Sequence, residues 1–229
     1  MKRHPAAFGS TRTDVDDVIR CVLGLASFAY SFNYLVANPN QINDSFGWHM
    51  QYLTIIGLSL AASTFAVGLL ADLTLSPTLF RIKNTLSIAS APMEVLISIL
   101  YWALRTIDPG LVMPDWAPVL SLKTDFSFHA IPSVALVVDL LFFSPPYAIS
   151  ALPALGLSSF IALAYWFWTE LCYSKNGFYA YPIFEQLDTP GRAALFSGSA
   201  VVMAVSTLSL SWLYGKVNGE EMDVKRKPR

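Results

Sequence analysis

The stretch from Thr124 to Phe143, TDFSFHAIPSVALVVDLLFF, constrains this chain more than any other, because it is apolar nearly throughout and as long as a membrane-spanning helix. Three ionisable residues, Asp125, His129 and Asp139, interrupt the run. Ionisable side chains are costly inside a bilayer, so each is expected either to serve a function or to hydrogen-bond a neighbouring helix. The stretch predicts a membrane protein and makes His129 the first candidate for a functional residue.

The composition supports a membrane protein and narrows its possible functions. The chain has 229 residues, of which 54% are hydrophobic and 14% are charged, well below the roughly 25% of ordinary soluble domains. A formal net charge of −1 provides no basic surface for phosphates, which argues against a nucleic-acid partner. The cysteines, Cys21 and Cys172, and the three histidines are too few and dispersed for a disulfide framework or a multi-histidine metal site. We therefore expect no metal and no cofactor.

Breaks rich in Pro, Asn, Asp and Gly divide the chain into six apolar segments, each long enough to cross a bilayer as a helix. The predicted spans are 18–37, 51–71, 86–106, 124–143, 147–171 and 193–214. Between the third and fourth spans, the proline-containing run LVMPDWAPVLSLK suits a short re-entrant or interfacial segment. The predicted fold is therefore an all-α polytopic membrane protein, with a six-helix domain at 18–214 between an N-terminal segment, 1–17, and a C-terminal tail, 215–229.

The basic residues predict how these spans are oriented. Six spans place both termini on one side, and that side receives eleven of the fifteen Lys and Arg residues. By the positive-inside rule both termini are cytosolic. The opposite side then holds Arg105, Lys123, Lys175 and Arg192. We expect the protein in an internal membrane, and the endoplasmic reticulum is the predicted one.

Thr54 and His129 are predicted to lie at similar depth. The second and fourth spans both enter from the non-cytoplasmic side, and each residue stands about one turn inside its span, at about 1.5 Å per residue. A hydroxyl beside an imidazole is the minimum for nucleophilic acyl transfer, because the alcohol is a weak nucleophile until a base removes its proton. An imidazole, with a reference pKa of about 6.5, suits that role. The alternative is that the Thr54 hydroxyl only bonds back to the preceding turn.

Four runs of residues carry a family resemblance: FGWHMQYLT at 46–54, YWALRTIDPGLV at 101–112, FHAIPSVALVVDLLFFSPP at 128–146 and NGFYAYPIF at 176–184. In this order, and with six predicted spans, they resemble the membrane proteins of the androgen-induced gene 1 family, also called the FAR-17a/AIG1-like family. The details are most similar to its fungal branch. The resemblance covers the chain from about residue 46 to residue 184.

The resemblance implies an activity and two catalytic residues. Animal members are described as integral-membrane hydrolases of fatty acid esters of hydroxy fatty acids, with an intramembrane threonine nucleophile and a histidine. Through the YLT motif the threonine corresponds to Thr54, and the histidine, ten positions before Asp139, corresponds to His129. Animal members have an Asn-His pair just before that histidine, where this chain has Asp125 and Phe126. Because of this difference, the resemblance does not define the substrate range, even if the hydrolytic chemistry is the same.

Other polar and aromatic residues are candidates for binding substrate or supporting the site. The predicted topology brings Arg105, Asp108, Asp125 and Glu170 to the same outer face as Thr54. One of these carboxylates can orient His129, and Arg105 can bind a fatty-acid carboxylate. Aromatic residues can line a lipid channel or form an interfacial belt, and the candidates are Trp48, Tyr101, Trp102, Trp116, Tyr179 and Tyr181.

Glu94 and Asp139 are the remaining acidic residues within predicted spans. Both are expected near mid-membrane depth, which places Asp139 about 15 Å from His129, too far to orient its ring. We predict that Glu94 and Asp139 hydrogen-bond each other with at least one protonated. A proton path through the pair is the alternative.

Three hypotheses follow from the sequence. The first is an intramembrane hydrolase that cleaves a lipid ester through an acyl intermediate on Thr54 with His129 as general base. The second is a non-enzymatic lipid-binding or partner-binding membrane protein in which these residues tie two helices together. The third, a transporter that uses Glu94 and Asp139, is the least supported, because no inverted repeat is visible. The sequence does not specify the oligomeric state.

Overall fold

The computed structural model describes residues 15–144 and 147–218, and within them all regular structure is helical. Five helices are long and apolar enough to cross a membrane: α1 (Val15–Ala37), α2 (Leu53–Thr74), α3 (Pro77–Ile107), α6 (Ala151–Asn176) and α8 (Thr189–Val217). The bent pair α4 (Leu122–His129) and α5 (Ile131–Phe143) is also long and apolar enough when taken together, which gives up to six candidate spans. The predicted all-α polytopic fold is confirmed. The predicted tails, 1–17 and 215–229, lie mostly outside the described residues.

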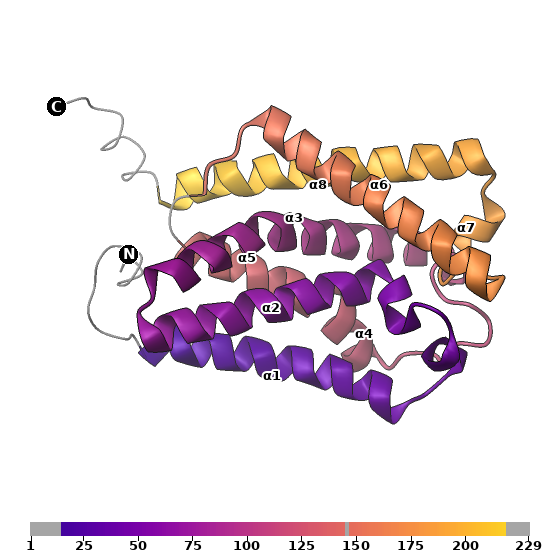
Figure 1. Cartoon of the computed structure of the whole chain (residues 1–229), viewed down its shortest axis with the longest axis horizontal. Coiled ribbons are helices and arrows are strands. Elements are labelled where there is room, and N and C mark those ends of the chain that lie inside the picture. Colours follow the sequence, from indigo (N-terminus) through magenta and orange to yellow (C-terminus); the bar gives the residue numbers. More distant parts are fainter. Residues whose placement is uncertain (1–14, 145–146, 219–229) are drawn as a thin grey trace.

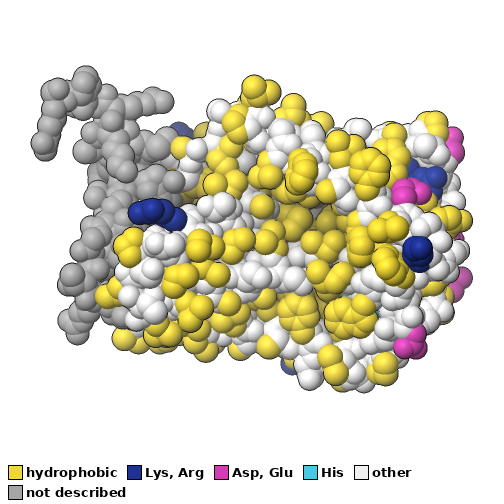
Figure 2. Space-filling view, in the orientation of Figure 1, with side chains coloured by type: hydrophobic (Ala, Val, Ile, Leu, Met, Phe, Trp, Pro, Cys, Tyr) yellow, Lys and Arg dark blue, Asp and Glu magenta, His cyan; other side chains and the backbone are white. Residues whose placement is uncertain are grey.

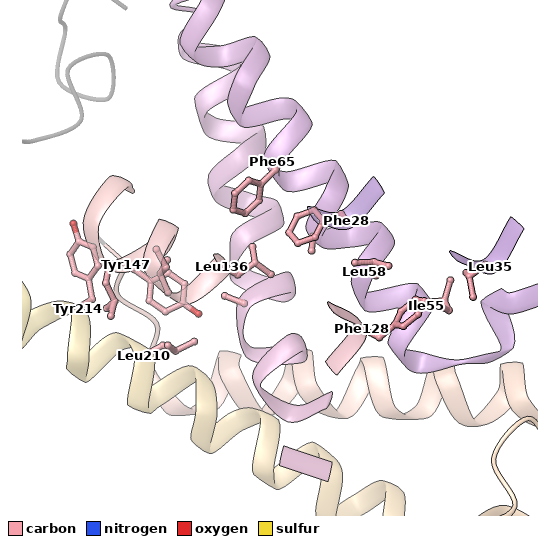
Figure 3. Packing of buried hydrophobic residues seen from close by; sticks show 14 residues of the cluster. Phe28, Leu35, Ile55, Leu58, Phe65, Phe128, Leu136, Tyr147, Leu210 and Tyr214 are labelled. Atoms are coloured by element: carbon pink, nitrogen blue, oxygen red, sulfur yellow. The ribbon is translucent and has the colours of Figure 1, made fainter. Parts of the chain in front are cut away.

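The helices lie side by side along one direction (Figure 1). Helix α2 packs between α1 and α3, while α6 packs mainly against α8, and α3 joins the two groups by contacting both α5 and α8. The largest core cluster lies among α1, α2 and α5 and continues to α8, with Phe28, Phe65 and Leu136 in its interior (Figure 3). The rings of Phe28 and Phe65 meet edge to face at 5.3 Å.

The outer surface is apolar over most of its width. Figure 2 shows hydrophobic side chains across the middle of the molecule, with acidic and basic side chains gathered near the ends. On α6, Leu152, Phe160 and Phe167 are 80%, 69% and 73% exposed. Such a surface suits hydrocarbon as the surrounding solvent, in agreement with the six candidate spans.

Short elements connect the long helices at the end of the molecule that holds the start of α2. Two 3-10 turns, η2 (Gln41–Asp44) and η3 (Trp48–Gln51), lie between α1 and α2, and η4 (Pro109–Leu111) follows α3. The short helix α7 (Ile183–Gln186) lies between α6 and α8. From residue 112 to residue 121, in the predicted re-entrant segment, the chain is irregular.

Helix α3 begins nine residues earlier than predicted. The predicted second and third spans, 51–71 and 86–106, leave the pair Ser76–Pro77 in the break between them, yet Ser76 is the N-cap of α3 and its side chain accepts from the Leu79 N–H. Pro77 stands in the first turn, where the missing N–H removes no hydrogen bond. The early start brings Lys83 inside the helix and buries it.

The fourth predicted span is one helix in the sequence pattern and two in the structure. Helices α4 and α5 meet at Ala130 with a bend of 42°. Pro132 explains the break, because it has no N–H to donate to the Phe128 carbonyl and its ring would clash with that carbonyl. The break makes His129 the last residue of α4.

A cluster of buried charges connects four helices at the end opposite to the start of α2. Asp139 of α5 forms ion pairs with Arg20 of α1 and with Lys83 of α3, whose Nζ lies 2.5 Å from its Oδ2. Arg20 also lies 3.6 Å from the carboxylate of Asp72 on α2. Ser144 accepts from Lys83 at 2.7 Å. Burial of these charges is compensated by mutual pairing.

The predicted hydrogen bond between Glu94 and Asp139 is wrong. Asp139 is paired with Arg20 and Lys83, and Glu94 stands about three turns, or ~16 Å, further along α3 than Lys83. The prediction failed because the early start of α3 was missed, so Lys83 was placed in the connection between the second and third predicted spans. Glu94 is 1% exposed, and in the described chain its Oε1 has no hydrogen-bond partner. It packs against Gly57, where an added Cβ would lie 2.5 Å from Oε1.

Replacing Asp139 by Ala should lower the free energy of unfolding by about 3–5 kcal/mol, because it leaves Arg20 and Lys83 without their shared buried partner. The measurement is thermal and denaturant unfolding in a fixed detergent. Glu94→Gln is the matched control, since it also neutralises a buried carboxyl on a membrane helix but breaks no ion pair. Equal stability losses for the two variants would contradict the role assigned to the cluster.

Candidate active site

Thr54 is the second residue of α2 and is held by tyrosines from the other helix group. The first turn of a helix has N–H groups without intrahelical acceptors. Here the Leu53 N–H donates to the Tyr165 hydroxyl at 3.1 Å, and the Thr54 N–H donates to the Tyr181 hydroxyl at 3.4 Å. Tyr165 in turn donates to the carbonyl of Gln51 at 2.8 Å. These bonds hold the start of α2, and with it Thr54, against Tyr165 and Tyr181.

The Thr54 side chain bonds the same phenol. Its Oγ1 lies 3.2 Å from the Tyr181 hydroxyl oxygen. Tyr181 comes from the loop between α6 and α7, and its ring packs edge to face against Tyr52 at 5.2 Å. Burial raises the pKa of Tyr181, so the phenol keeps its proton at neutral pH and remains a hydrogen-bond donor. Thr54 itself is 6% exposed.

His129 is oriented by a carboxylate one turn earlier on α4. Its Nδ1 lies 3.0 Å from Asp125 Oδ1 and 3.1 Å from the Asp125 carbonyl oxygen. Both partners are acceptors, so the neutral ring carries its proton on Nδ1 and leaves Nε2 as the acceptor. The ring also stacks on Tyr101, with centroids 3.3 Å apart and planes within 4°. Its position and its tautomer are therefore both set by neighbours.

Asp125 is completely buried and is held by α3. It forms an ion pair with Arg105, and it accepts from the Tyr101 hydroxyl at 2.5 Å. Arg105 also donates to Tyr101 at 2.7 Å. Asp125 thus pairs with Arg105 while it accepts from His129. The network joins α3 to α4 around the imidazole.

Thr54 and His129 open into one cavity of about 660 Å³, which we call the histidine cavity. Tyr101, Tyr181 and the irregular segment 112–120 form much of its remaining wall. Within the described residues no hydrogen bond joins Thr54 directly to His129. The hydroxyl is engaged with Tyr181 instead.

A second cavity of about 830 Å³ lies on the other side of Thr54, and we call it the apolar cavity. It is enclosed by α2, α3, α6 and α8 and is lined mainly by aliphatic and aromatic side chains. Four residues border both cavities, namely Thr54, Tyr101, Val112 and Tyr181. The candidate nucleophile therefore stands in the wall between two chambers.

Comparison with known proteins identifies the family. The model of the FAR-17a/AIG1-like proteins matches residues 17–215. This chain belongs to the FAR-17a/AIG1-like family. A UPF0641 membrane protein of Schizosaccharomyces pombe is 36% identical over 194 residues, which is 84% of this chain and 87% of that protein. No solved structure matches the chain.

The structure brings together three of the supporting residues predicted from the family resemblance and from the topology. Tyr101, Arg105 and Asp125 surround His129, and Asp125 is the carboxylate that orients its ring. Arg105 pairs with Asp125 and borders neither cavity, and its predicted binding of a fatty-acid carboxylate stays a prediction. Tyr181 bonds Thr54.

Other predicted candidates lie elsewhere. Trp48 packs against His49 in η3 and borders neither cavity. Glu170 accepts from the hydroxyl of Tyr179 at 3.0 Å and lies on α6, away from His129. Asp108 caps its own turn by accepting from the Gly110 N–H at 2.8 Å. In the described residues no group of His, Cys, Asp and Glu is arranged to hold a metal ion.

Sequence reasoning missed Tyr165. It was assigned to an interfacial aromatic belt with its neighbours Trp166, Phe167 and Trp168, yet it is 7% exposed and bonds the start of α2. Phe167, by contrast, is 73% exposed. The aromatic run does not show which of its residues faces lipid and which supports the start of α2. Only the contact of Tyr165 with Leu53 distinguishes these two roles.

Proposed function

We propose that this family member is an intramembrane hydrolase of lipid esters, with Thr54 as nucleophile and His129 as general base. The observation that carries the proposal is the arrangement of His129, whose Nδ1 is bonded to buried Asp125 while its ring borders the cavity that Thr54 also borders. A carboxylate, an imidazole and a hydroxyl in this order form the arrangement that activates an alcohol for acyl transfer. Fatty acid esters of hydroxy fatty acids are the proposed substrates, by analogy with the animal members.

The chemistry proceeds in two steps. As Thr54 Oγ1 attacks the ester carbonyl carbon, His129 Nε2 takes its proton, and Asp125 stabilises the charged ring. The bond between the carbonyl carbon and the alcohol oxygen breaks, His129 returns the proton to that oxygen, and an acyl-Thr54 ester remains. A water molecule, deprotonated by His129, then attacks the acyl group and releases the fatty acid and free Thr54.

Two donors beside Thr54 suit the charge that develops on the carbonyl oxygen. The Thr54 N–H and the Tyr181 hydroxyl approach each other at 3.4 Å in the free protein. A substrate oxygen placed between them would accept from both, and the N-terminal end of α2 adds a favourable dipole. Tyr181 is a suitable donor because burial keeps it protonated.

The alternative function is a non-enzymatic lipid-binding or partner-binding protein in which Thr54 and His129 are structural. It is favoured by the bond from Thr54 to Tyr181, which ties α2 to the α6–α7 loop without any contribution from His129. The same cavities would then hold a lipid without cleaving it. Turnover by the purified protein decides between the two functions.

Thr54→Ala should abolish ester hydrolysis and labelling by a fluorophosphonate, while Thr54→Ser should keep measurable activity because it retains the hydroxyl. Mass spectrometry of the labelled wild-type protein should place the adduct on Thr54. Folding is checked by thermal stability in detergent, since neither change removes much buried apolar surface. Full turnover by Thr54→Ala would eliminate this mechanism.

Asp125→Asn should lower kcat by about 10²–10⁴-fold, because the amide removes the negative charge that stabilises the ring of His129 when it takes the proton of Thr54. His129→Gln should be about as inactive, and the double variant should be no worse than either single one. The measurement is kcat on one lipid ester, with unfolding in detergent as the control. A purely structural tie predicts the reverse pattern, with reduced stability and intact labelling of the folded fraction.

We further propose that both termini are cytosolic and that the Thr54 end faces the lumen of the endoplasmic reticulum. The described basic residues are balanced between the two ends, so the bias depends on the seven Lys and Arg residues of 1–14 and 219–229. Glycosylation acceptors inserted on spacers into 38–46 and 177–188 should be modified in cells, and acceptors at the termini should not. Modification at the termini would reverse the orientation.

A further inference from the structure

The two cavities that meet at Thr54 differ in chemistry. The apolar cavity has no charged side chain and no His, Asn or Gln in its wall, and its deep end is formed by residues such as Met93, Ala200 and Met203. It extends along α3 from Leu104 to Met93, about three turns or ~16 Å. The wall provides hydrocarbon contact and few hydrogen bonds, which suits a long alkyl chain.

The histidine cavity has a more polar wall. Asn40 and His49 border it together with His129, and the irregular segment 112–120 contributes Trp116 and Ala117. His49 bonds the side chain of Asn43 at 3.2 Å, and burial lowers its pKa, so it is neutral at neutral pH. This cavity can accept a group that carries oxygen atoms without placing it against a fixed charge.

The position of the base determines which part of an ester enters which cavity. His129 must return its proton to the departing alcohol oxygen, so that oxygen leaves on the side of the imidazole. His129 borders only the histidine cavity of the two, whereas Thr54 borders both. The acyl chain, on the other side of the carbonyl carbon, must extend away from the imidazole.

We propose that the apolar cavity is the acyl-chain site and that the histidine cavity is the site of the alcohol portion of the ester. This assignment rests on the proposed hydrolase function and goes beyond it, because it predicts two separate determinants of specificity. The length of the apolar cavity, which lies between α3, α6 and α8, determines which acyl chains fit. The histidine cavity, which the 112–120 segment helps to enclose, determines the size and polarity of the alcohol that fits.

Two matched variants test the assignment by placing the same large side chain in each cavity. Ala200→Phe fills the apolar cavity from α8, and Ala117→Phe fills the histidine cavity from the irregular segment. Each purified variant is assayed against one ester series that varies only the acyl chain and another that varies only the alcohol. Thermal unfolding in detergent confirms that both variants are folded.

Ala200→Phe should lower kcat/KM for long acyl chains by at least about tenfold relative to short ones, since one methylene group excluded from a hydrophobic pocket changes kcat/KM by about 10–200-fold. It should leave the order of preference among alcohols unchanged. Ala117→Phe should change the alcohol preference and leave the acyl-length profile intact. Exchanged effects, with Ala117→Phe shortening the acyl range, would overturn the assignment.

A second readout separates this assignment from the hydrolase proposal. A long-chain fatty acid with a photoreactive diazirine at its terminal carbon is crosslinked to purified wild-type protein and to the Ala200→Phe variant. Adducts in wild type should map to α8 or α6 residues that line the apolar cavity and should be strongly reduced by Ala200→Phe. Such adducts without any ester turnover would support the chain site and refute hydrolysis. Adducts confined to segment 112–120, or to outward-facing Phe160 and Phe167, would refute the chain site even where turnover is intact.

Discussion

Two buried carboxylates connect the broken span α4–α5 to α3, and the rest of the molecule depends on these connections. Asp125 pairs with Arg105 near one end of α3, and Asp139 pairs with Lys83 near the other. The pairs hold a helix that Pro132 has interrupted, and an interrupted helix inside a membrane must have its backbone and charges satisfied by neighbours. The consequence is that His129, at the break, has a fixed place although the helix around it is discontinuous.

In the proposed hydrolase, Asp125 serves the fold and the chemistry with the same charge. Its pairing with Arg105 joins α3 to α4, and its bond to His129 fixes the ring with Nε2 as the acceptor. Tyr101 contributes to both as well, because its hydroxyl donates to Asp125 while its ring stacks on the imidazole. The proposed mechanism therefore couples stability and activity at this residue, because removing the charge of Asp125 affects both its pairing with Arg105 and its bond to His129.

Sequence reasoning predicted the apolar helices and placed Thr54 and His129 at the same end of them, where both border one cavity, because both predictions depend on local properties, namely apolar length and distance from a helix end. It failed where the outcome depended on which helices are neighbours. Ser76–Pro77 begins a helix instead of separating two, and Lys83 is consequently the partner of Asp139. Nothing in the local pattern distinguished Glu170, which bonds Tyr179, from Asp125, which bonds His129.

In the proposed mechanism, the location of Thr54 near the end of its helix suits the two environments, hydrocarbon and water, that ester hydrolysis needs. A fatty acyl chain is stable in hydrocarbon, and the apolar cavity extends from Thr54 along α3 into the membrane domain. Breakdown of an acyl-Thr54 intermediate needs water, which is scarce at the centre of a bilayer. A nucleophile at the first turn of α2, with the irregular segment 112–120 above it and the apolar cavity below, lies where a lipid chain and a water molecule can both reach the same carbonyl carbon.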